Sequence, residues 1–346
     1  MKKMINIFTV GFLLMFILTQ YGFAQENKKL AQTGFQFLSV VSDAHGAAMA
    51  DALTSLQVGS SALFFNPAGM AEMNTFFDVS ASTNKWIADI THTTFSAAFN
   101  PYEGKYGIIG LSAQYVDYGE FYGTVVNSAS QQGYDDTGIF KLSALALGLG
   151  YAKQISDRFS IGGQVKWVRQ DLGETTIPVN IRVDSTSVGG ERVADTTTTS
   201  NKLSPFVFDF GTQFKTGIKS LVFGMSIRNF SKEVQYAEEG FQAPLTFTLG
   251  ISMNVMDLVG ELPFEQSLYV SVDASHYRDH PEQIKIGLDY RIMNMISIRG
   301  GYASNNDEND FTFGLGFTQF GFTLDYAYTP FGVFNNVQRF TARFAL

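Results

Sequence analysis

Apolar side chains alternate with polar or small ones in many segments of this chain, each about 9–12 residues long. Successive side chains of a β-strand point to opposite faces, so each segment has one apolar face and one polar face. In residues 283–292, Ile284, Ile286, Leu288, Tyr290 and Ile292 form one face, and Gln283, Lys285, Gly287, Asp289 and Arg291 form the other. The pattern predicts an all-β fold whose strands are longer than the usual five or six residues.

The apolar faces of such strands pack either on a protein core or on lipid, because a soluble β-sandwich also alternates. Two features favour lipid. Aromatic residues gather towards the ends of the apolar faces, as the aromatic girdles of an outer-membrane barrel require. The segments also have the length that a tilted strand needs to cross the hydrocarbon layer. The interpretation is an outer-membrane β-barrel, with a soluble sandwich as the alternative.

The composition excludes several other classes of protein. Only 16 % of the 346 residues are charged, against about 25 % in an average protein, which argues against disorder and coiled coil. The chain contains no Cys, which removes disulfides, thiolate zinc sites and cysteine nucleophiles. A net charge of −8 argues against nucleic acid as a partner.

The N-terminus has the pattern of an export signal. Lys2 and Lys3 precede an apolar run that ends at Leu18, and Gly22 and Ala24 have the spacing of a small-x-small cleavage site. The run is shorter than the roughly 20 residues of a membrane-spanning helix. We therefore expect a signal peptide over residues 1–24, export by the Sec pathway and cleavage after Ala24. Residues 25–75 are then a plug segment, and residues 76–346 a transmembrane barrel.

Fourteen candidate strands lie within residues 76–346, and single-chain bacterial barrels have an even number. Short turns alternate with longer stretches between these strands, as expected for turns on the periplasmic side and loops on the outside. The longest stretches are 117–139, 171–202 and 230–244, which we expect to be outer loops that contact partners. The predicted fold is a 14-stranded antiparallel outer-membrane β-barrel with a short, partly helical N-terminal plug in its lumen.

The plug segment is not strand-like. An Ala-rich stretch over 44–53 predicts a short helix, and an Asn-Pro step follows it in a turn, because Pro67 fixes its own φ and biases Asn66 away from helix. The predicted plug helix residues are Ala44, His45, Met49 and Asp51, and the predicted plug motif is Asn66, Pro67, Ala68 and Gly69.

Charges of both signs occur on the polar faces of the predicted strands, which line the lumen of a barrel. Opposite charges can neutralise each other there and hold the plug, and we favour this structural role over a selective path. A plug of about 50 residues leaves little room for an open pore, so passive porin function ranks third. The predicted luminal charges are Lys166, Asp209, Arg228, Asp273, Lys285, Asp289, Arg291, Arg299 and Asp325.

Signals for catalysis or metal binding are weak. His276 and His280 have the i, i+4 spacing of a zinc-protease helix, but no Glu follows His276, and Pro281 comes directly after His280. A solvated loop explains this pair better than a metal site does. No Gly-x-Ser-x-Gly elbow occurs. We therefore predict a protein that is not an enzyme and that has no metal or cofactor.

Three stretches of the plug segment resemble the PorV/PorQ family, which is part of the FadL-like group of outer-membrane proteins. Residues 62–71 are similar to the family's Asn-Pro-Ala-Gly box, residues 42–52 to its Ala-rich box and residues 34–38 to its opening. Residues 112–119 are similar to a strand motif of the same family. The chain departs from the family at His45, where Arg is commoner, and at Ala50, where Gly is usual.

The resemblance implies a 14-stranded barrel with the N-terminal segment in its lumen. In the PorV/PorQ branch it implies a non-enzymatic accessory of type IX protein secretion or surface attachment, whose partners are secretion-pathway proteins or secreted cargo. In the FadL branch it implies a transporter of long-chain fatty acids or other hydrophobic ligands. With roughly 19 residues per strand and connection, the outer loops are modest, which favours the secretion branch. FadL-like transport is the alternative.

Overall fold

The computed structural model describes residues 33–126, 132–183, 192–236, 239–259, 264–306, 310–332, 334 and 336–346. The predicted signal peptide and its cleavage site after Ala24 lie outside these residues.

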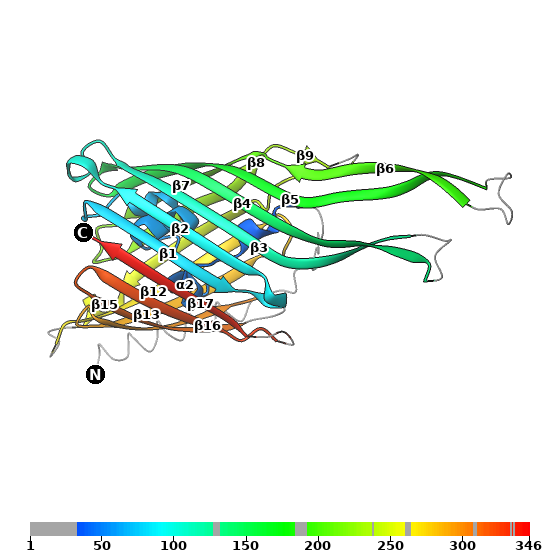
Figure 1. Cartoon of the computed structure of the whole chain (residues 1–346). Coiled ribbons are helices and arrows are strands. Elements are labelled where there is room, and N and C mark those ends of the chain that lie inside the picture. Colours follow the sequence, from blue (N-terminus) through cyan, green and yellow to red (C-terminus); the bar gives the residue numbers. More distant parts are fainter. Residues whose placement is uncertain are drawn as a thin grey trace.

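The strands close into a 14-stranded antiparallel barrel (Figure 1), which confirms the predicted fold. The last strand pairs with the first, and β4 pairs with β5, so the sheet has no open end. The barrel strands are β1 (Phe77–Lys85), β2 (Thr91–Phe99), β3 (Ile108–Val126), β4 (Tyr134–Ser156), β5 (Phe159–Val183), β6 (Arg192–Leu203), β7 (Phe206–Lys215), β8 (Val222–Ser231), β11 (Thr246–Asn254), β12 (Gln266–Tyr277), β13 (Gln283–Ile292), β14 (Ile296–Ala303), β15 (Phe311–Gln319), β16 (Phe322–Thr329) and β17 (Val337–Ala345). Both β6 and β7 pair with β5 and share one position, and β9 (Val234–Gln235) and β10 (Gly240–Phe241) form a separate hairpin.

The two ends of the barrel differ. Asp78 pairs with Ala345, so the chain enters its first strand and leaves its last strand at the same end, where short turns such as that between β13 and β14 also lie. We call this the turn end. The opposite end, which we call the loop end, carries the long connections between β3 and β4, β5 and β6, and β8 and β11, whereas the longest connection at the turn end is 255–265, between β11 and β12.

Two of the predicted outer loops are wrong, because most of their residues form strands. β3 and β4 continue to pair as far as Val126 and Tyr134, and β5 and β6 as far as Val183 and Arg192. Residues 118–126 and 134–142, which we call the β3–β4 ribbon, extend beyond the barrel, as do β6 and its partner residues in β5 (Figure 1). Aromatic and β-branched residues favour strands in both ribbons. Within the third stretch, 230–244, lie the short strands β9 and β10.

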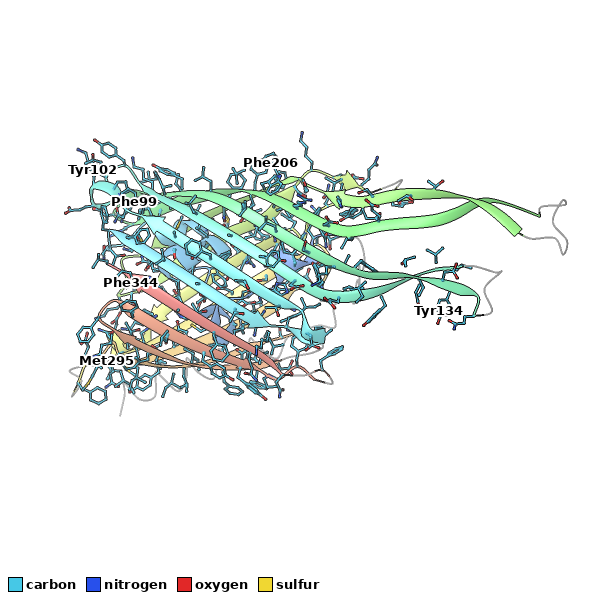
Figure 2. The ribbon with its side chains drawn as sticks, in the orientation of Figure 1. Phe99, Tyr102, Tyr134, Phe206, Met295 and Phe344 are labelled. Atoms are coloured by element: carbon cyan, nitrogen blue, oxygen red, sulfur yellow. The ribbon has the colours of Figure 1, made fainter. Side chains whose placement is uncertain are left out.

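The apolar faces of the strands are on the outside of the barrel (Figure 2). Burial alternates along β7 and β15, with Phe206, Phe210 and Leu315 among the exposed side chains. A soluble sandwich would bury this face, whereas a membrane barrel presents it to lipid. The soluble alternative is therefore excluded. Separately, no helix within the described residues is both long and apolar enough to cross a membrane.

The N-terminal segment lies inside the barrel and contains α2 (Ala44–Ala48) and the 3-10 helices η1 (Gln36–Ser39), η2 (Gly59–Phe64) and η3 (Pro67–Met70). Three more 3-10 turns lie in connections, namely η4 (Ile87–Asp89), η5 (Pro101–Gly104) and η6 (Val255–Leu258). The prediction of a helix over 44–53 is wrong beyond Ala48. Ala50 and Asp51 have φ of 50° and 64°, in the left-handed region, and the chain turns because the wall at Gly301 blocks further helix.

Candidate functional site

Inward-facing glycines let the plug backbone touch the barrel wall. A Cβ atom added to Gly162 would lie 2.5 Å from the backbone nitrogen of Ala68, and one added to Gly301 would overlap the backbone of Ala50. Glycine inside a strand is typical where another backbone approaches closely. The residues whose Cβ would collide with the plug form a set that we call the glycine belt: Gly110, Gly150, Gly162, Gly211, Gly224, Gly250, Gly287, Gly301 and Gly314.

The predicted plug motif lies where η3 meets this belt. Asn66 Nδ2 donates hydrogen bonds to the carbonyl oxygens of Thr54 (2.7 Å) and Thr212 (3.1 Å), and Asn66 Oδ1 accepts one from the Ala68 amide (3.1 Å). Pro67 occupies the first turn of η3, where a missing N–H costs nothing. Asn66 thereby joins two parts of the plug to a wall strand.

All nine predicted luminal charges lie on inward faces, and four of them contact the plug. Asp273 Oδ2 accepts a hydrogen bond from the Thr54 amide (3.1 Å), and Arg228 Nη1 donates one to the Phe64 carbonyl (2.5 Å). Lys285 Nζ lies 3.4 Å from Asp51, and Asp289 lies 3.4 Å from His45. The other five are Lys166, Asp209, Arg291, Arg299 and Asp325, and they pair with wall residues.

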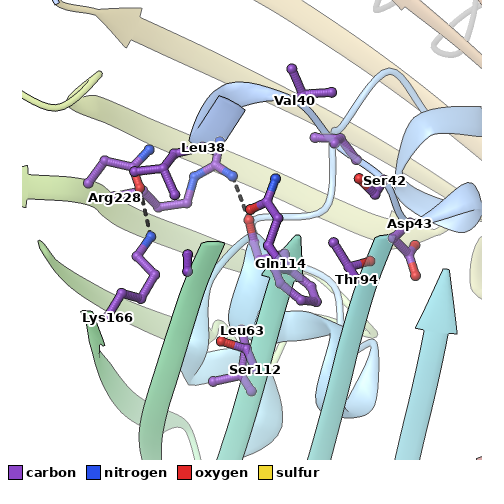
Figure 3. A pocket seen from close by; sticks show the side chains of 14 residues that line it. Leu38, Val40, Ser42, Asp43, Leu63, Thr94, Ser112, Gln114, Lys166 and Arg228 are labelled. Carbon is purple, nitrogen blue, oxygen red and sulfur yellow. Dashed lines mark hydrogen bonds between the residues drawn. The ribbon is translucent and has the colours of Figure 1, made fainter. Parts of the chain in front are cut away.

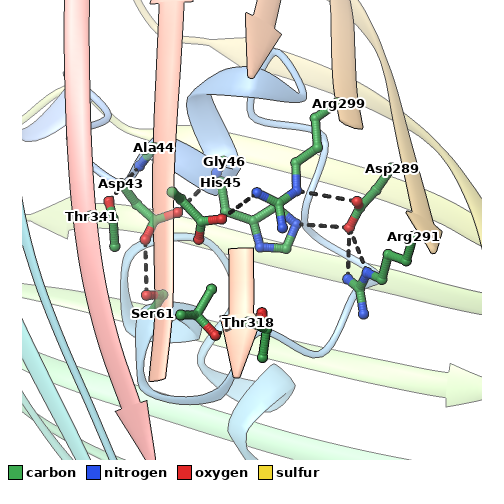
Figure 4. A network of polar contacts seen from close by, with 12 residues as sticks. Asp43, Ala44, His45, Gly46, Ser61, Asp289, Arg291, Arg299, Thr318 and Thr341 are labelled. Carbon is green, nitrogen blue, oxygen red and sulfur yellow. Dashed lines mark hydrogen bonds and ion pairs between the residues drawn. The ribbon is translucent and has the colours of Figure 1, made fainter. Parts of the chain in front are cut away.

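The largest charged network joins α2 to the wall (Figure 4). Asp289 contacts Arg291 (2.7 Å) and Arg299 (3.2 Å), and Arg299 also binds Asp325 (2.5 Å). Two carboxylates thus face two guanidinium groups. Burial, followed by the charge of Arg299, lowers the pKa of His45, so its imidazole is neutral at pH 7. The network is therefore balanced without a cation at position 45.

The remaining predicted plug residues have distinct places. The Ala44 amide donates to Thr341 Oγ1 (2.8 Å), which fixes the start of α2 on β17. Met49 follows the helix and is fully buried in a core that plug side chains form together with side chains of the barrel wall. Asp51 comes after the turn and contacts Lys285. Ala44 and His45 are therefore the only two of the four that belong to α2.

An apolar surface inside the lumen was not foreseen from the sequence. Near the loop end, the inward side chains of Val116, Val168 and Val207, together with Ala144 and Ala146, form what we call the apolar lumen patch. The side chains of Phe35, Phe37 and Leu38 cover it. A break in the alternation was the available signal, because Val116 directly follows Tyr115 and Val168 directly follows Trp167.

A small cavity lies beside this patch, between the plug and the wall (Figure 3). Its volume is about 30 Å³, which is room for one or two water molecules. Lys166, Arg228 and Asn229 line it from the wall, and Leu38, Val41 and Leu63 from the N-terminal segment. A larger molecule can occupy this part of the lumen only if the lining side chains move.

The start of the described chain is fastened at the loop end. The Gly34 amide donates to the Gln242 carbonyl (3.0 Å), and the side chains of Thr33 and Gln36 donate to Asp279. Burial acts to raise the pKa of Asp279, but hydrogen bonds from His280, Thr33 and Gln36 outweigh it and hold the pKa well below its usual range. The ionised Asp279 thus holds the segment that covers the apolar lumen patch.

We expect Asp279→Asn to loosen residues 33–38 while leaving the barrel folded. Hydrogen bonds to a charged group contribute about 1.5–3 kcal/mol, so amide exchange of this segment should accelerate by about tenfold or more. In the parent protein the attachment has its full strength above the unfolded pKa of about 4, weakens as pH falls below that value and is lost only as pH falls through the lowered pKa of the folded state. Hydrogen–deuterium exchange at pH 7 and pH 3 measures both effects. Asp257→Asn, at the turn end, is the control, and equal exchange in both variants would contradict the assignment.

No metal site emerges in the part of the chain that the structure describes, where no three His, Asp or Glu side chains gather suitably. His276 Nδ1 lies 3.0 Å from Glu282, and His280 Nδ1 lies 2.8 Å from Asp279. These two histidines therefore contact different carboxylates.

Solved structures similar to this one include a transporter, a channel and a FadL homologue. The toluene transporter TodX of Pseudomonas putida has a TM-score of 0.55 and 13 % identity, over 92 % of this chain and 98 % of TodX. A FadL homologue of Pseudomonas aeruginosa has a TM-score of 0.54 and 13 % identity, over 88 % and 98 % of the two chains. The monoaromatic hydrocarbon channel CymD has a TM-score of 0.52 and 11 % identity, over 88 % and 97 %.

No protein-family model matches the chain, and no curated protein is a match. At 11–13 % identity, the similarity establishes the fold: this chain folds into the same kind of 14-stranded outer-membrane barrel as these proteins.

Proposed function

We propose that the barrel transports small hydrophobic compounds across the outer membrane. The apolar lumen patch is the observation that carries this proposal. Barrel lumens are ordinarily polar, and most of this lumen is, yet Val116, Val168 and Val207 face inward next to one another near the loop end. A hydrophobic compound that enters from the outside can transfer from water onto such a surface.

The fold supports the same proposal, since TodX and CymD are described as a toluene transporter and a monoaromatic hydrocarbon channel. Phe35, Phe37 and Leu38 already occupy the patch. A ligand would therefore compete with these side chains. Its affinity would depend on the strength of the hydrogen bonds by which Asp279 holds residues 33–38 in place. We therefore propose transport as the main function, in place of the secretion role that the modest length of the outer loops favoured.

An accessory role in type IX secretion is the second candidate. It is supported by the Asn66–Gly69 motif and by the two ribbons that extend beyond the barrel, which offer surface to another protein. In this role the lumen would stay closed and would bind no hydrophobic ligand. The two candidates thus differ in what the purified barrel binds.

Val116→Thr and Val168→Thr should weaken the binding of radiolabelled toluene or palmitate to the purified barrel. Thr is nearly isosteric with Val, so the change mainly places a hydroxyl in an apolar surface. Because Phe35, Phe37 and Leu38 already bury these positions in the free barrel, the comparison is made in the Asp279→Asn background, in which residues 33–38 are loosened and water reaches the hydroxyls. Burying them unpaired under a ligand then costs about 1–3 kcal/mol, and the double substitution should weaken binding at least about tenfold. Val165→Thr, on the outer face of the same strand as Val168, is the matched control. An unchanged affinity in the double variant, or no binding by the parent, would refute the proposal.

A further inference from the structure

The β3–β4 ribbon is a two-stranded structure with two free edges. β2 pairs with β3 no further than Asp117, and β5 pairs with β4 no further than Ser143. Beyond these points neither edge has a strand partner among the described residues. A lone two-stranded ribbon is marginally stable in water, and its edges expose backbone groups that template the addition of another strand.

Large apolar side chains are exposed on this ribbon, away from the lipid-facing belt. The exposed fractions of Tyr122, Val126 and Ile139 are 81 %, 75 % and 55 %, and Ile139 and Tyr122 are cross-strand partners. On the opposite face the rings of Phe121 and Phe140 stack with centroids 5.7 Å apart. Figure 2 shows Tyr134 near the far end, well beyond the barrel. Proteins normally protect a sheet edge with charge rather than surround it with aromatic residues.

The two edges are not equivalent. Between Gly123 and Thr124 the pairing shifts by one residue, because β4 carries the extra Thr137, and such a bulge bends the strand that contains it. β3 runs without an extra residue from Glu120 to Val126. The β3 edge is therefore the one on which a further strand can form a regular ladder.

The net charge of the β3–β4 ribbon indicates which class of partner it can bind. The ribbon contains three acidic residues, Glu120, Asp135 and Asp136, and one basic residue, Lys141, which pairs with Glu120 (2.9 Å). A net negative ribbon repels anionic lipid and nucleic acid. Only a polypeptide presents N–H and C=O groups at the spacing of a sheet edge.

We infer that the β3–β4 ribbon is a docking site for another protein, which adds a basic, extended segment to the β3 edge at Glu120–Val126. Tyr122 and Val126 would pack against the side chains of that segment. The lumen takes no part in this contact, so the site is independent of the transport function.

A photo-crosslinking amino acid at position 122, in the full-length protein in its own outer membrane, tests the docking site. Tyr102 is the control position, because it is equally accessible (75 % exposed) but lies at the turn end. We expect a protease-sensitive adduct of one discrete mass from position 122 and none from position 102. Asp135→Asn combined with Asp136→Asn should reduce this adduct at least severalfold and leave toluene binding unchanged.

Hydrogen–deuterium exchange tests strand addition itself. Amides of residues 120–126 should exchange at least severalfold more slowly in native membranes than in the purified barrel. An adduct with lipopolysaccharide, an adduct of twice the monomer mass, an adduct that the Asn variants do not reduce, or equal exchange in the two preparations would each overturn the inference.

Discussion

Asn66→Asp is expected to detach the plug from the barrel wall and to reduce the amount of folded barrel. The substitution replaces a donor that serves the carbonyl oxygens of Thr54 and Thr212 with a carboxylate that both carbonyls repel. Each unsatisfied buried group costs about 1–3 kcal/mol, and the new charge is buried without a partner. We expect a loss of more than about 3 kcal/mol, measured as the folded fraction on heat-modifiable gels and as the urea midpoint.

Two control variants separate the causes of that loss. Asn66→Ala removes the same hydrogen bonds without adding charge and should cost less than Asn66→Asp. Asn305→Asp changes an exposed loop residue whose side chain donates to the Glu282 carbonyl and should have almost no effect. Parent-like migration and urea midpoint in Asn66→Asp would show that the motif does not hold the plug.

Gly162→Ala and Gly301→Ala should each destabilise the protein, whereas alanine at the neighbouring glycine of each strand should not. A Cβ at Gly162 or Gly301 meets the plug backbone, but at Gly163 the nearest atom is 3.4 Å away and at Gly300 it is 3.9 Å away. Overpacking of this kind typically costs about 1–3 kcal/mol. Urea midpoints of the four variants provide the measurement.

The glycine belt also predicts a functional consequence of these substitutions. A plug displaced by Gly162→Ala leaves a gap along the wall, so cells that carry this variant should become more permeable to small polar antibiotics. Gly163→Ala cells should behave like the parent. If the two glycines of either pair respond alike, close contact with the plug is not the reason for glycine there.

The strand pattern could be predicted because period-two alternation is a local property of the sequence. All fourteen segments have counterparts in the barrel. The ribbons could not be predicted, because Gly119 and the bulge at Thr137 interrupt the alternation in the manner of a loop. Their strands depend on pairing with each other, which a single segment does not reveal.

Inward positions were harder to assign than outward ones. The nine charges fall on the lumen side because charge is excluded from lipid, so their face follows from residue type alone. An apolar residue such as Val168 or Val207 can face either lipid or an apolar part of the lumen. Only the packing of these two side chains with Phe35 and Leu38 shows that they face inward. The prediction of a helix over 44–53 was wrong for a similar reason. The helix ends where the plug meets the wall at Gly301, which is far away in sequence.

The preference for secretion over transport rested on modest loop lengths. Loop length describes only the outer surface, whereas a transported compound passes through the lumen. The apolar lumen patch and the fold shared with TodX and CymD favour the transport alternative instead.

Uptake by intact cells tests the central claim most directly, because the lipopolysaccharide layer retards hydrophobic compounds. Initial rates of radiolabelled toluene, palmitate and glycerol uptake would be compared in cells with the protein, without it and with the Asp279→Asn/Val116→Thr/Val168→Thr variant. The account predicts that loss of the protein slows toluene or palmitate uptake severalfold, that the variant does the same and that glycerol uptake is unchanged. Equal toluene and palmitate uptake with and without the protein, or loss of glycerol uptake alone, would contradict it.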